Sequence, residues 1–274
     1  MASPENRKSL WLKAQAKKFS WEEAAISLGI VLLIFAVWYV VAWLEIYKRY
    51  FVPTPYSVWK AFLETCTVGY RGKSLLEHFE ISMVRVLVGF LAACATAIPL
   101  GLAMGWYPRI RALFDPLLEF YRPLPPLAYY TLLIIWLGIE DESKIALLYL
   151  AAFPPLALSA RAGVKRVSEE RIHGAQSLGA NRWQVFRHVV FPSCLPEIFT
   201  GMRVAIGFTY TTLVASEMVA ARSGLGWMVL DAYKYLRSDV VFMGIIVLGL
   251  TGIVLDRLLR LAEHLAVPWK GKET

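Results

Sequence analysis

The chain has 274 residues, of which 57% are hydrophobic and only 18% are charged, and its mean hydropathy is +0.50. One soluble core cannot bury that much apolar surface, so the composition predicts a membrane protein. The formal charge of +8 comes from Lys and Arg scattered between apolar runs, which argues against the basic stripe of a nucleic-acid-binding protein. The three cysteines form no Cys-x-x-Cys pair, and they support no metal, redox or disulfide role.

The first apolar run, residues 24–44, is uncharged and follows a polar, basic segment over residues 1–23. About 21 helical residues at 1.5 Å each span a hydrocarbon core of roughly 30 Å. The run is too long for a signal-peptide core and no small-residue cleavage site follows it, so we expect an uncleaved anchor. In residues 51–62, Pro53 and Pro55 predict an extended entry to a helix lying at the outer membrane surface.

Five more spans are predicted, which makes six in a membrane domain over residues 24–264; they cover residues 84–107, 115–139, 145–160, 198–221 and 240–255. In the second span a small residue recurs every four positions, which favours a static packing face over a moving pore wall. Prolines 123, 125 and 126 predict a break or kink in the third span.

Charge bias predicts the orientation of these spans. Six spans place both termini on one side, and the segments on that side carry nearly twice as many Lys and Arg as the others. The positive-inside rule therefore predicts that the N-terminal segment, the loop over residues 161–197 and the tail over residues 265–274 are cytoplasmic.

The loop over residues 161–197 is basic and amphipathic and lies between two apolar spans. Gly179 predicts a helix end, and Asn181 stands where an N-cap would begin a second helix with an apolar stripe through Trp183 and Phe186. On periodicity alone, a helix lying on the lipid headgroups fits this pattern as well as a docking element for another protein does.

The fifth span is unusually polar for a helix that faces lipid, and we predict that it lines a transport path. The candidate path residues are Thr209, Tyr210, Thr212, Ser216 and Glu217. The alternative is that the hydroxyl groups bond back to their own helix and that the charged groups lie where water reaches them. Glu119 and Arg122, three residues apart, could flank the path or form an ion pair at the headgroups.

Enzyme chemistry is missing from the sequence. Gly72-Lys73-Ser74 supplies only the end of a P-loop, because Thr67 stands where the leading glycine is required. The four histidines do not fall at metal-ligand spacing, and no Ser/His/Asp arrangement is present. We expect no catalytic site and no cofactor bound by this chain.

The loop also resembles the EAA loop of ATP-binding-cassette (ABC) importer permeases. The pattern in this chain is His173-Gly174-Ala175, three residues, Gly179, nine residues, and then Val189-Val190-Phe191-Pro192. It departs from the family at two positions, because His173 replaces the family's Glu and Gly174 replaces its first Ala. The resemblance implies coupling helices that dock on an ATPase subunit. The implied coupling residues are His173, Gly174, Ala175, Gly179, Ala180, Trp183, Phe191 and Pro192.

Residues 121–145 are similar to the corresponding segment of the nitrate, sulfonate and taurine branch of that family, with Thr131 where many members have proline. The similarity covers about residues 30–270 and implies an all-α membrane protein with the type I, MetI-like permease architecture. It implies a homodimer in the bacterial inner membrane, two ABC ATPase subunits that hold ATP and Mg, and an extracytoplasmic binding protein. The implied substrate is a small sulfonate, taurine first. Nitrate, alkanesulfonate or another small solute of the branch is an alternative, and an ATP-independent secondary transporter is an alternative of another class.

Overall fold

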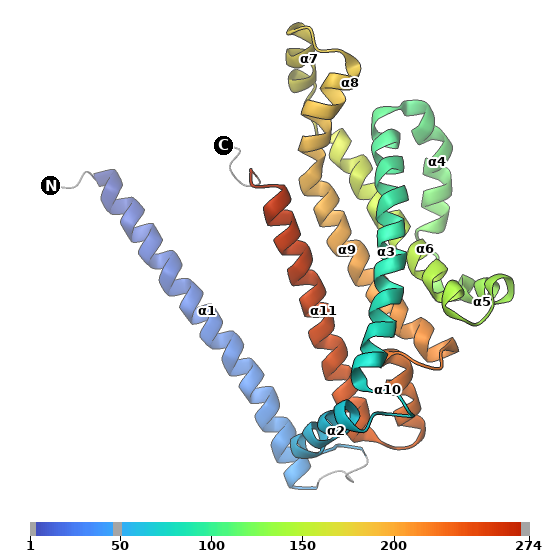
Figure 1. The fold of residues 1–274 in the computed structure, drawn as a ribbon. Helices are drawn as coiled ribbons and strands as arrows, with labels where there is room; N and C mark the ends of the chain where they lie inside the picture. The colour runs from blue at the N-terminus through green and yellow to red at the C-terminus, as the bar shows by residue number, and fades with distance from the viewer. Residues whose placement is uncertain (1–3, 46–50, 270–274) are drawn as a thin grey trace.

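The structure is a computed structural model that describes residues 4–45 and 51–269, and these residues are almost entirely helical (Figure 1). Residues 1–3 and 270–274, which belong to the two predicted cytoplasmic segments, lie outside the described residues. The helices are α1 (Pro4–Trp43), α2 (Pro55–Thr67), α3 (Leu75–Trp106), α4 (Pro108–Tyr121), α5 (Pro126–Leu137), α6 (Asp141–Lys165), α7 (Glu169–Ser177), α8 (Arg182–Val185), the π-helix η1 (Phe186–Val190), α9 (Phe191–Ala220), α10 (Leu225–Lys234) and α11 (Ser238–Ala266).

Among the described residues, five helical segments are long and apolar enough to cross a membrane: Trp21–Trp43 of α1, α3, α6, Arg182–Ala220 and α11. The predicted third span over residues 115–139 is not one helix. It is divided into α4 and α5, because Pro123 and Pro125 stand in the connection and Pro126 begins the next helix. With 12 residues, α5 is about 18 Å long, well short of a bilayer core.

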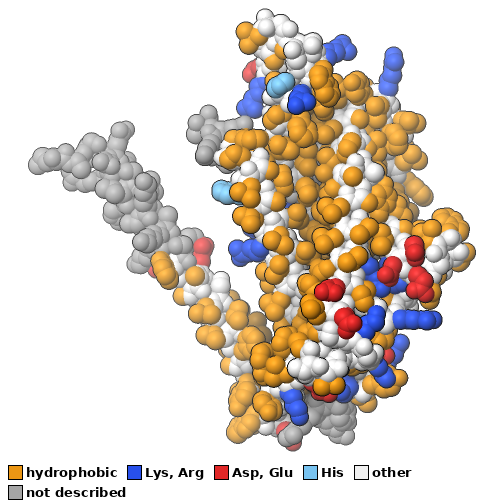
Figure 2. Space-filling model, in the orientation of Figure 1, with side chains coloured by type: hydrophobic (Ala, Val, Ile, Leu, Met, Phe, Trp, Pro, Cys, Tyr) orange, Lys and Arg blue, Asp and Glu red, His pale blue; other side chains and the backbone are white. Residues whose placement is uncertain are grey.

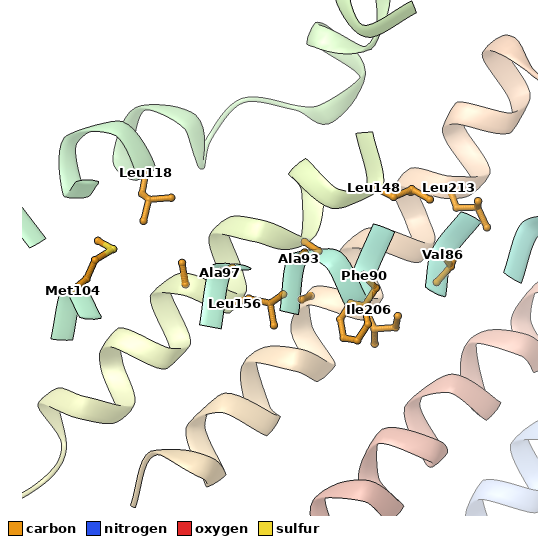
Figure 3. Close-up of a cluster of buried hydrophobic side chains, with 13 residues drawn as sticks. Val86, Phe90, Ala93, Ala97, Met104, Leu118, Leu148, Leu156, Ile206 and Leu213 are labelled. Atoms are coloured by element: carbon orange, nitrogen blue, oxygen red, sulfur yellow. The ribbon is translucent and has the colours of Figure 1, made fainter. Parts of the chain in front are cut away.

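The core of the bundle is formed by α3, α6 and α9, which run side by side (Figure 1). The small-residue face of α3 packs on α6. A Cβ added at Gly89 would lie 2.8 Å from Leu148 Cβ, and one added at Gly101 would lie 2.2 Å from the backbone oxygen of Ala157. Figure 3 shows the buried side chains that fill the remaining space, among them Phe90 of α3 and Leu156 of α6.

Helix α1 leans away from this core (Figure 1), and no residue in the most apolar part of its span is fully buried within the single chain. Trp38 attaches it, because its Nε1 donates to the Pro53 oxygen at 3.0 Å and its ring stacks on Phe242. The predicted surface helix is present as α2, which Thr54 caps by accepting from the Ser57 N–H.

The bundle has two distinct ends (Figure 1). One carries α7 and α8, together with the first turns of α1 and the last turns of α11, and the other carries α2 and α10. Figure 2 shows a mostly apolar surface between the two ends, as expected for a body that lipid or other protein surrounds.

Candidate functional site

The predicted docking element forms a knob, defined here as residues 166–190. The knob projects beyond the end of α3 (Figure 1). It consists of α7, α8 and η1. Helix α7 ends where the N–H of Ala180 donates to the Ala175 oxygen and the N–H of Gly179 donates to the Gln176 oxygen. This pair of bonds is a Schellman motif, and it requires the left-handed backbone that Gly179 adopts, with φ +86°.

The second half of the knob starts at a capping box. The Asn181 side chain accepts from the Gln184 N–H at 2.9 Å, and the Gln184 side chain accepts from the Asn181 N–H at 2.8 Å. Helix α8 then continues through the π-helix η1 into α9 without a break. The predicted helix end at Gly179 and the predicted N-cap at Asn181 are both confirmed.

The tip of the knob is exposed and partly apolar. Leu178 is 91% exposed, and Trp183, which stacks on Phe186, is 65% exposed. A hollow of 380 Å³ lies beside them, lined by Ala175, Leu178, Gly179, Ala180, Gln184, Val185, His188 and Val189. Exposed apolar side chains next to a hollow are typical of a protein-binding surface.

The base of the knob, in contrast, is packed into the bundle. Val185 and Val190 are fully buried, against Cys194 of α9 and Ala160 of α6. The Phe186 ring also meets Trp106, at the end of α3, edge to face. The base of the knob is therefore in close-packed contact with α3, α6 and α9.

The predicted coupling residues divide between these two regions. His173, Gly174 and Gly179 are exposed with Leu178 and Trp183, and His173 Nδ1 lies 3.3 Å from Gln176 Oε1. Ala175 and Ala180 are half-buried against the base. Phe191 and Pro192 begin α9, where Phe191 is 39% exposed.

The predicted path residues of α9 are engaged inside their own chain. Thr209 and Ser216 are buried and donate to the Ala205 and Leu213 oxygens of the same helix, each at 2.8 Å. The Tyr210 hydroxyl donates to the Leu248 oxygen of α11, and Thr212 is 7% exposed. Their assignment to a transport path stays a prediction.

Glu217 is the centre of a buried polar network. Its Oε1 accepts from Arg85 Nη1 and Ser82 Oγ, and its Oε2 accepts from the Gly226 N–H, each at 2.8 Å. Arg85 also binds Asp141 Oδ1 with Nε and Nη2. The network joins α3, the start of α6, α9 and the α9–α10 turn.

Sequence reasoning missed Arg85, Ser82 and Asp141. The available signal was that Arg85 and Glu217 are isolated charges in apolar spans, and such charges pair when the spans pack together.

A second polar cluster lies at the end of the bundle opposite the knob. Asp231 Oδ2 accepts from the Tyr70 hydroxyl at 2.9 Å and from Arg71 Nε at 3.0 Å. Burial, with the hydrogen bond to Asp231, raises the pKa of Tyr70 to about 12, so its hydroxyl remains a donor at neutral pH. The cluster anchors the turn that contains Gly72-Lys73-Ser74 to α10.

A cavity of 520 Å³ lies beside the α4–α5 break. Its walls come from the break itself, from α6 and from α9, and they are mostly apolar. The polar side chains among the lining residues are Tyr121, Arg122, Tyr129, Ser159 and Glu197. Arg122 is exposed, and its guanidinium has no hydrogen-bond or ion-pair partner among the described residues.

Known proteins resemble this chain over most of its length. Residues 97–265 match the family model described as "Binding-protein-dependent transport system inner membrane component". The taurine transport system permease protein TauC of Escherichia coli is 41% identical over 266 residues, which cover 95% of this chain and 97% of TauC. The putative aliphatic sulfonates transport permease protein SsuC of Bacillus subtilis is 29% identical over 266 residues, which cover 97% of this chain and 94% of SsuC.

A solved structure of the MetNI methionine ABC transporter, in an inward-facing conformation, shares the fold. Its matching chain gives a TM-score of 0.59 at 17% identity, covering 71% of this chain and 94% of that chain. With a family model that matches most of the chain and a relative aligned over nearly all of it, the chain belongs to the binding-protein-dependent transport system inner membrane components, the permeases of ABC importers.

Proposed function

We propose that the chain is the membrane-spanning subunit of an ATP-driven importer for a small sulfonate, with taurine as the first candidate. The relative aligned over 95% of the chain is a taurine permease, which supports this substrate class. An alkanesulfonate or nitrate is the alternative substrate within the same branch. The chain itself carries out no catalysis, and ATP and Mg are bound by the partner ATPase.

The observation that carries the proposal is the knob, with its exposed tip and its buried base. Leu178 and Trp183 at the tip offer apolar side chains to an ATPase subunit, while Val185 and Val190 fix the base to the core helices. ATP-driven closure of two ATPase subunits would draw two knobs together and turn the attached bundles. The substrate path would then open to one side of the membrane in one state and to the other side in the other state.

This mechanism requires two copies of the chain and a defined orientation. The first turns of α1 and the last turns of α11 lie at the knob's end of the bundle, which supports one shared side for the knob and both termini. The excess of Lys and Arg in these segments supports the cytoplasmic side. The end with α2 and α10 then faces the binding protein. In this arrangement α4 and α5 jointly take the place of the predicted third span, residues 115–139, since α5 is too short to cross the membrane by itself.

The path is expected along α9. Val204, Phe208 and Thr211 are exposed on this helix in the present conformation. Thr209, Tyr210, Thr212, Ser216 and Glu217 would reach the path only when the bundle rearranges. Cysteines at 209, 212 and 216 should react with a water-soluble reagent in one nucleotide state, and failure to react in every state would remove them from the path.

The function is tested by reconstitution. The chain is purified in mild detergent with the ATPase that accompanies it, placed in proteoliposomes, and supplied with the binding protein and labelled taurine. We expect uphill uptake that needs ATP, the ATPase and the binding protein. Uphill uptake by this chain alone, without nucleotide, would overturn the proposal, and uptake of nitrate in place of taurine would correct the substrate.

A further inference from the structure

The cavity beside the α4–α5 break has the size and lining of a small-molecule site. Its volume of 520 Å³ falls within the range of about 300–1,000 Å³ that is usual for such sites. Leu150 and Pro154 of α6 and Val204 and Phe208 of α9 form an apolar wall. Three of the five polar side chains, those of Tyr121, Arg122 and Tyr129, come from the α4–α5 region.

Arg122 brings to this cavity a positive charge that none of the described residues pairs with. Its side chain is exposed, and Glu119, one turn earlier, makes no ion pair with it. The other charged residue on the wall, Glu197, already accepts a hydrogen bond from Arg166. The charge in the cavity is therefore complementary to an anion.

The position of Arg122 along α4 places its charge within the depth of the membrane. Helix α4 has 14 residues, so Arg122 lies about 20 Å along its axis from the α3–α4 turn. The hydrocarbon core is only about 30 Å thick, and an arginine inside it is costly unless it faces water or a polar partner. A hydrated, anion-binding cavity supplies such surroundings.

A second donor lies beside the arginine. The Tyr121 hydroxyl donates to the Tyr129 hydroxyl, and both side chains line the cavity. The proton of Tyr129 is then available for an acceptor in the cavity, since the described residues show no bond that uses it. A planar guanidinium and a phenol O–H are suitable donors for the oxygens of a sulfonate.

We propose that this cavity is a transient binding site for the sulfonate group of the substrate, held by Arg122 and Tyr129. The identity of the substrate in this inference rests on the proposed function. The presence of an anion site does not, because it follows from the cavity and its donors. The apolar wall would contact the carbon chain, and the volume leaves room for sulfonates longer than taurine.

A labelling experiment tests the site without relying on transport. Ser159, on the cavity wall, is replaced in S159C on a Cys66→Ser background, because Cys66 is exposed. Membranes with the full complex are treated with either of two small thiosulfonate reagents, one ending in a sulfonate and one in a quaternary ammonium. The same background without S159C corrects for reaction at the other cysteines.

We expect the anionic reagent to label S159C about tenfold faster than the cationic one, as befits one charge-assisted contact. Arg122→Gln should abolish the preference, Arg122→Lys should keep part of it, and millimolar taurine should slow labelling only where a charge is present at 122. Glu119→Gln is the matched control and should change nothing. Equal labelling by both reagents, no reaction with either, or the same loss in Glu119→Gln would overturn the site.

Uptake separates this inference from the proposed function. In the reconstituted importer, Arg122→Gln should lower taurine uptake about tenfold while ATP hydrolysis stimulated by the binding protein persists. Normal uptake by this variant would refute the site and leave the proposed function standing. Anion-selective labelling in a complex that transports no sulfonate would refute the substrate and leave the anion site standing.

Discussion

At the scale of single residues, the buried pair of Arg85 and Glu217 is expected to matter most for stability. Glu217→Ala leaves the Arg85 guanidinium, 5% exposed, with one carboxylate partner fewer. Removing one partner of a buried pair costs about 3–5 kcal/mol, so a large drop in the melting temperature of the detergent-solubilised protein is expected.

The control for this prediction is the exposed pair of Arg260 and Asp256. Arg260→Gln should shift the melting temperature little, because exposed i,i+4 pairs contribute about 0.5 kcal/mol or less. A Glu217→Ala variant as stable as the parent protein would contradict the network described here.

Gly179 makes a second prediction at this scale, now about coupling. Valine at φ +86° is a backbone outlier, since even an ordinary L-residue in that region costs about 1–2 kcal/mol. Gly179→Val should therefore disrupt the turn between α7 and α8. The expected result is loss of ATPase association, or of substrate-stimulated ATP hydrolysis, with normal membrane insertion.

Gly174 provides the matched control. It is also an exposed glycine of the knob with open space around its Cα, but it lies inside α7 and has no positive φ. Gly174→Val should keep association and coupling far better than Gly179→Val does. Equal effects of the two substitutions would show that ATPase association and coupling do not depend on the left-handed turn at Gly179.

At the scale of elements, the contact between α3 and α6 predicts that a glycine-to-alanine substitution in α3 lowers stability, although helix propensity alone predicts that it raises stability. Glycine to alanine inside a helix normally stabilises it by about 1 kcal/mol. At Gly101, however, the added Cβ would lie 2.2 Å from the Ala157 oxygen, so α3 and α6 would have to separate. Gly101→Ala should lower the melting temperature, whereas Gly249→Ala, with nothing within 4 Å, should leave it equal or higher.

The elements also show how far the sequence can be read. Prolines and glycines act on the backbone locally, so the α4–α5 break and the α7–α8 turn were predictable from their positions. The pairing of Arg85 with Glu217, 132 residues apart, depends on how α3 and α9 pack, which no local pattern states. The π-helix η1 was missed for a related reason: one widened turn, with the Phe191 N–H bonded to the Phe186 oxygen, barely changes the apolar periodicity.

At the scale of the whole molecule, a single chain exposes polar side chains on a surface that would otherwise face lipid, and a membrane protein normally shields such groups from lipid. Arg122, which has no partner among the described residues, and the exposed Thr211 of α9 are polar groups in a mostly apolar body. One chain also presents only one knob. A second copy facing the first across α9 would enclose these groups and place two knobs on the same side. If each knob docks on one ATPase subunit, as proposed, two knobs would take two ATPase subunits.

Native mass spectrometry of the complex released from detergent should therefore give two permease chains with two ATPase chains. In the same preparation, Thr211→Cys should form a cross-link between two permease copies with a short bifunctional thiol reagent. Cysteine at Phe242, which packs on Trp38 inside one chain, is the control and should not cross-link. A one-to-one complex that still couples ATP hydrolysis to uptake would contradict the paired arrangement, because a lone bundle would then have to enclose the path by itself.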